Sequence, residues 1–261
     1  SARLIVTLAL DRAVTALSRL PESEGAGPGT ALGLQVLQTA VSRLASVGFE
    51  DLDRALRNFQ AIREGQPFAH SPPQSRRALA RLAPALAAAL ESVPDPDLAL
   101  TTFERFITTV AARTTFLTLL ADTQGLLSLL VRLFGTSEFL SATLLHHPEL
   151  LDALLTPEPA TRHGRERVAA DLQRALAGAE RGSARLDALR RVKKAEELRI
   201  GLQDILDRAD VTETHRALTH LAEACLEAAL QMADQDLTAR FGTPDPPGFA
   251  IVALGKLGGK E

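Results

Sequence analysis

Residues 125–135 read Gly-Leu-Leu-Ser-Leu-Leu-Val-Arg-Leu-Phe-Gly, a stretch that is apolar almost throughout and has glycine at both ends. A helix that is apolar nearly all round is typical of a buried, central element. Gly135 is a suitable residue to end it, and Ser137 stands where the N-cap of a next helix belongs. The stretch therefore predicts a core helix at residues 126–134, followed by a short helix that runs to His146.

Helical spacing continues in both directions from this core, and alternation of apolar and polar residues is almost absent before the last dozen residues. Between residues 98 and 120, for example, apolar side chains recur at steps of three and four, so one face of a helix packs. The expected fold is mainly α, a multi-helix array. The predicted helical ranges are 3–20, 30–46, 49–64, 74–91, 98–120, 126–134, 138–146, 149–155, 165–179, 183–207 and 212–241.

Proline-rich and glycine-rich breaks divide this array. Residues 67–73 (Pro-Phe-Ala-His-Ser-Pro-Pro) and 243–248 (Thr-Pro-Asp-Pro-Pro-Gly) are predicted linkers, because each proline lacks an N–H donor and disfavours helix before it. The predicted domains are accordingly an N-terminal helical leader at 1–66, a helical domain at 74–242 and a further domain that starts at 249–261.

Composition excludes several classes of protein. The net charge is −3 and there are ten Phe but no Trp or Tyr, so a nucleic-acid-coating protein is disfavoured. The single cysteine, Cys225, excludes an internal disulfide and a four-thiolate metal site and fits a reducing, cytoplasmic location. No run approaches the roughly eighteen apolar residues of a membrane helix, so no membrane partner is expected.

The pattern changes at residues 249–254 (Phe-Ala-Ile-Val-Ala-Leu), a short run without a polar face, which predicts a strand buried on both sides. It leads into Gly255, Lys256, Gly258 and Gly259. Glycines let a backbone approach an anion, so this segment is a candidate phosphate-binding site. It matches neither the Walker A sequence nor the dinucleotide fingerprint, and a tight turn without ligand explains the spacing equally well.

The residues at 249–261 (Phe-Ala-Ile-Val-Ala-Leu-Gly-Lys-Leu-Gly-Gly-Lys-Glu) closely resemble the start of the nucleotidyltransferase motif in glutamine synthetase adenylyltransferases. Three upstream segments resemble signatures of that family in the same order. The likeness covers roughly residues 95–261, with fainter support at 48–51. The three segments are 132–140 with 147–151, 186–194 with 198–200, and 218–223.

The resemblance implies an enzyme that transfers AMP to a tyrosine of glutamine synthetase, or removes it by phosphorolysis, and so regulates nitrogen metabolism. It implies ATP or ADP, Mg²⁺ and a PII-type signalling protein as regulator. It also implies a truncated α/β nucleotidyltransferase domain whose first strand is 249–254, and carries Gly255, Lys256, Gly258 and Gly259 over as phosphate contacts.

In the family an Asp-x-Asp pair on the next strand holds the metal ions. That pair is expected beyond Glu261, so the resemblance implies a catalytically inactive fragment that contains no metal ligands. Both halves of the family's tandem enzymes share this order of elements. The helical leader favours the first, AMP-removing half. The alternative from another class is a non-catalytic helical scaffold that docks protein partners, with Gly258 and Gly259 serving only as a turn.

A basic run lies within residues 190–199. Arg190 and Arg199 are candidate contacts for a phosphate or for the protein substrate, but a solvated helix face explains the run as well, with Lys193 and Glu197 as an ordinary surface pair. Cys225 is predicted to be a small buried hydrophobe. Asp95 and Asp97 are predicted to be turn and capping residues. The spacing of the histidines is not that of a metal site.

Overall fold

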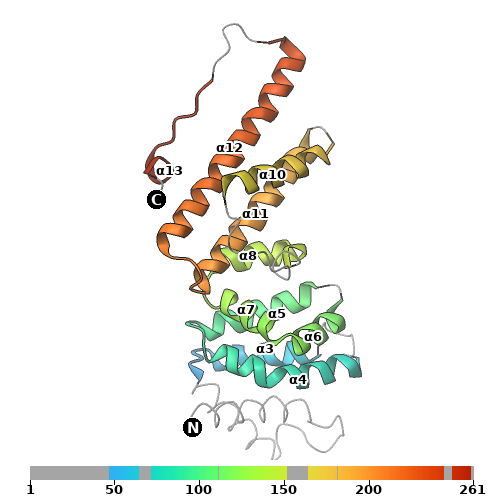
Figure 1. Cartoon of the computed structure of the whole chain (residues 1–261). Coiled ribbons are helices and arrows are strands. Elements are labelled where there is room, and N and C mark those ends of the chain that lie inside the picture. The colour runs from blue at the N-terminus through green and yellow to red at the C-terminus, as the bar shows by residue number, and fades with distance from the viewer. Residues whose placement is uncertain are drawn as a thin grey trace, which may run out of the picture. The chain divides into compact units, whose positions relative to one another are not determined.

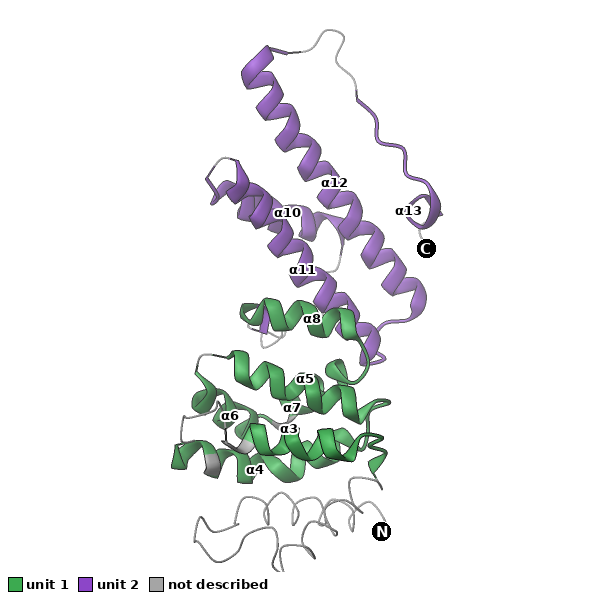
Figure 2. Cartoon of the chain, turned by 180° about the vertical axis from the view of Figure 1, so that it is seen from behind, with its two compact units in different colours: residues 1–149 green, residues 150–261 purple. Residues whose placement is uncertain are grey.

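The computed structural model describes residues 47–64, 72–110, 112–151, 164–180, 182–243 and 249–259, and most of these residues are helical (Figure 1). The mainly α prediction is confirmed. The predicted helices at 3–20 and 30–46, and with them most of the leader at 1–66, lie outside the described residues. The chain divides into two compact units, residues 1–149 and 150–261 (Figure 2).

Unit 1 is a set of helices packed around α7, as the apolar stretch at its centre predicts. Helix α7 packs against α4, α5 and α6, and its residues Leu127, Leu130 and Leu133 are fully buried. The helices of this unit are α3 (Leu52–Glu64), α4 (Pro73–Leu90), α5 (Pro96–Thr109), α6 (Arg113–Asp122), α7 (Gln124–Phe134) and α8 (Glu138–His146).

Three phenylalanines form the centre of the unit 1 core. Phe106 on α5 lies with its ring centroid 5.6 Å from that of Phe116 on α6 and 5.6 Å from that of Phe134 on α7. Phe106 and Phe134 are completely buried. Edge-on and tilted contacts of this kind are favoured by the aromatic quadrupole, so one ring joins three helices.

One predicted helix is divided in the structure. The range 98–120 was expected to be continuous, but α5 ends at Thr109 and α6 begins at Arg113. Thr108, Thr109 and Val110 form a β-branched run that disfavours helix, and Val110 takes an extended backbone conformation. The apolar spacing predicts the helices on both sides of this break, but it contains no signal of the interruption.

The starts of α3 and α5 are joined by an aspartate for which the sequence predicts only a turn or capping role. Asp95 does cap α5, accepting a hydrogen bond from the Leu98 N–H at 2.8 Å. Asp97 is buried and instead accepts the Glu50 N–H at 2.7 Å, with Arg54 3.6 Å away. Its carboxylate therefore ties the start of α3 to the start of α5.

Ser137 accepts a hydrogen bond from the Leu140 N–H at 3.3 Å, which confirms it as the N-cap of α8. Just before it, Gly135 closes α7 where the chain passes the 93–95 loop. A Cβ on Gly135 would lie 2.9 Å from the Val93 Cβ and 3.0 Å from the Asp95 carbonyl oxygen. Glycine is therefore required here by a close approach between two segments.

We expect Gly135→Ala to lower the free energy of unfolding by about 1–3 kcal/mol, because the added methyl group forces two packed segments apart. Urea unfolding followed by far-UV circular dichroism measures this. Gly125→Ala is the matched control, since nothing lies within 4 Å of a Cβ there and alanine favours helix. Equal stability of the two variants would contradict the steric role of Gly135.

Unit 2 contains three long helices that pack against one another: α10 (Arg165–Ala177), α11 (Ser183–Ile205) and α12 (Val211–Phe241). Their shared core is aliphatic and includes Leu172, Ile200 and Leu221. Asp210 and Glu213 form a reciprocal capping box at the start of α12, which explains its sharp N-terminus. Gly242 follows the helix at positive φ, a conformation that glycine adopts without strain.

The predicted strand at 249–254 is not formed. No strand is present among the described residues, and these six residues are non-helical and exposed, with Val252 at 80%. A strand needs a hydrogen-bonding neighbour, and the described part of the chain contains none. The expected α/β domain is therefore not confirmed. The predicted domain boundaries also stay predictions: residues 244–248 and most of 67–73 lie outside the described parts.

Among the described residues no single helix has the length and hydropathy needed to cross a membrane. Helix α6 and residues 125–134 meet that criterion only when taken together, across a bend of 109°. The buried side chains of α7 identify it as a core helix of unit 1.

Candidate functional site

The glycine-rich segment at the C-terminal side of unit 2 forms α13 (Gly255–Gly259), a helix of five residues. The sequence predicts a turn at Gly258 and Gly259, but they lie inside this short helix. Gly255 opens it with φ +65°, a conformation that glycine adopts without strain. The residue with positive φ is Gly255, three residues before Gly258.

Gly258 is held against the preceding apolar run. A Cβ on Gly258 would lie 2.6 Å from the Ala253 carbonyl oxygen, a distance at which something must shift. Lys256 is exposed, in the first turn of α13. The arrangement combines a tight backbone turn, glycines without side chains and one exposed positive charge, the features that let a backbone approach an anionic group.

The other two candidate residues, Arg190 and Arg199, lie in different settings on α11. Arg190 forms an exposed ion pair with Asp187 on the same helix, at 2.9 Å. Arg199 lies in a different setting: its Nε and one terminal nitrogen donate to Glu196 Oε2 at 3.0 and 2.8 Å. The predicted surface pair of Lys193 with Glu197 is confirmed at 2.5 Å.

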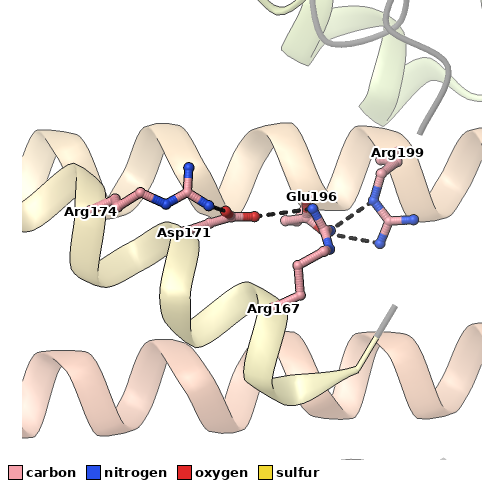
Figure 3. Close-up of polar contacts among 5 residues, drawn as sticks. All are labelled: Arg167, Asp171, Arg174, Glu196 and Arg199. Carbon is pink, nitrogen blue, oxygen red and sulfur yellow. Dashed lines mark hydrogen bonds and ion pairs between the residues drawn. The ribbon is translucent and has the colours of Figure 1, made fainter. Parts of the chain in front are cut away.

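Glu196 is the centre of an ion network between α10 and α11, drawn in Figure 3. Arg167 on α10 donates to the same Glu196 oxygen at 2.5 Å and to Asp171 at 3.0 Å. Arg174 donates to the other oxygen of Asp171. The Glu196 side chain is 9% exposed, and those of Arg167 and Arg199 are 18% exposed. One carboxylate thus joins two guanidinium groups from two helices.

The ionisation of Glu196 reflects this setting. Burial works to raise its pKa, but the hydrogen bonds and charges of Arg199 and Arg167 outweigh burial and leave the pKa below the ordinary value of 4.5. The carboxylate is therefore charged at neutral pH. Part of this network was visible in the sequence, because Glu196 and Arg199 are three apart on a helix. Arg167 was not, since it lies 29 residues away.

No group of three or more His, Cys, Asp or Glu side chains among the described residues has the arrangement of a metal site. Cys225 is half-buried against the unit 2 core, and burial raises the pKa of its thiol. It behaves as the small hydrophobe that the sequence predicts.

Comparison with known proteins identifies the family. The model of the family described as glutamate-ammonia ligase adenylyltransferase matches residues 127–261, which is more than half of the chain. The chain belongs to this family. The match begins in α7 and includes the Glu196 network and α13, so both candidate regions lie within the matched residues.

Two curated relatives of this adenylyltransferase family member carry the name bifunctional glutamine synthetase adenylyltransferase/adenylyl-removing enzyme. The protein from Thioalkalivibrio sulfidiphilus is 32% identical over 92% of this chain, and the one from Chromobacterium violaceum is 31% identical over 93%. The chain spans 27% of the length of each of these relatives.

Proposed function

We propose that this chain is part of an enzyme that transfers AMP to a tyrosine of glutamine synthetase or removes it by phosphorolysis. The observation that carries the proposal is the glycine turn at 255–259, with Gly258 against the Ala253 carbonyl, inside the range that the family model matches. The names that the two relatives carry favour this activity over a non-catalytic docking scaffold.

The proposal places a phosphate group of ATP or ADP beside residues 255–259. The missing side chains of the glycines leave room for the anion, and the exposed Lys256 ammonium provides an opposite charge. Mg²⁺ would supply charge neutralisation of the phosphates. The described residues do not fit a magnesium site, so none of them is assigned to the metal. The proposal includes regulation by a PII-type signalling protein, but it assigns no surface of this chain to that contact.

The experiment that tests the proposal uses the full product of the gene that encodes this chain. Purified protein is incubated with magnesium and with glutamine synthetase in its modified or unmodified form. Release of ADP from modified glutamine synthetase and phosphate identifies AMP removal, which we propose for this half. Incorporation of AMP from ATP identifies AMP attachment instead. Folded protein that performs neither reaction would contradict the proposed function.

We expect Gly258→Ala to reduce the nucleotide-dependent activity by about 100-fold, because the added methyl group displaces a turn that positions the phosphate. The measurement is kcat/KM for the nucleotide substrate, made with the full gene product. Gly125→Ala serves as the control, as its open surroundings predict unchanged activity. Full activity of Gly258→Ala, with an unaltered structure, would remove this segment from the site.

A further inference from the structure

We draw no further inference here: the strongest candidate, the apolar stripe that Leu226, Leu237 and Phe241 expose along α12, carries none because nothing in the described part of the chain shows what covers it.

Discussion

Phe106→Ala is expected to lower the free energy of unfolding of unit 1 by about 4 kcal/mol, the largest effect of any single substitution considered for this chain. Phe106 is fully buried and contacts two further rings on α6 and α7. Its removal loses the transfer free energy of the side chain and leaves a cavity at the junction of three helices. The aromatic contacts add to this loss.

The absence of Trp and Tyr makes intrinsic fluorescence a poor probe, so hydrogen exchange followed by mass spectrometry is the better measurement. Some amides of α5 and α7 exchange only when the whole unit opens. Peptides that contain them should exchange several hundred-fold faster in Phe106→Ala than in the native chain. Phe139→Ala is the control: Phe139 is 66% exposed, and its removal should change stability by less than about 0.5 kcal/mol. Similar exchange in both variants would show that the aromatic core does not stabilise unit 1.

Glu196→Ala is expected to destabilise unit 2 by about 3 kcal/mol, because it removes the carboxylate shared by two largely buried arginines. Arg167 and Arg199 would then lose their common partner while remaining mostly desolvated. Exchange of α10 and α11 peptides reports the loss. Asp187→Ala on the same helix is the control, since its pair with Arg190 is exposed on both sides and contributes little.

The same residue predicts a pH dependence. The pKa of Glu196 is lowered in the folded chain, so its charge stabilises unit 2 above the ordinary pKa of 4.5. That contribution is lost as the pH falls below 4.5 and through the lowered pKa of the folded state. We therefore expect the stability difference between the native chain and Glu196→Gln to be largest at neutral pH and to shrink on acidification below about pH 4.

This difference is measured by thermal unfolding of the native chain and of Glu196→Gln at several pH values, with hydrogen exchange of unit 2 peptides as the readout. A gap that stays constant between neutral pH and about pH 3 would mean that the charge of Glu196 does not stabilise the α10–α11 contact. Retention of the pH dependence in Glu196→Gln would assign it to other carboxylates.

Several features of the fold depend on local spacing and were predictable. The apolar stretch 126–134 forms the core helix, Ser137 caps α8, and Lys193 pairs with Glu197, because each depends on neighbours within four residues. Family membership was also readable, since it rests on ordered motifs. In the candidate site, the sequence shows which positions are glycine, but it does not predict that these glycines lie inside the helix α13.

What the sequence by itself determined is therefore the helical class of the chain, its caps and its family, all of which follow from residue order. The tertiary structure alone decided the contacts between distant segments. Arg167 reaches Glu196 across 29 residues and Asp97 reaches Glu50 across 47. Residues 249–254 show the same limit: their β-type pattern records a preference, but a strand forms only where a second extended segment supplies the hydrogen bonds.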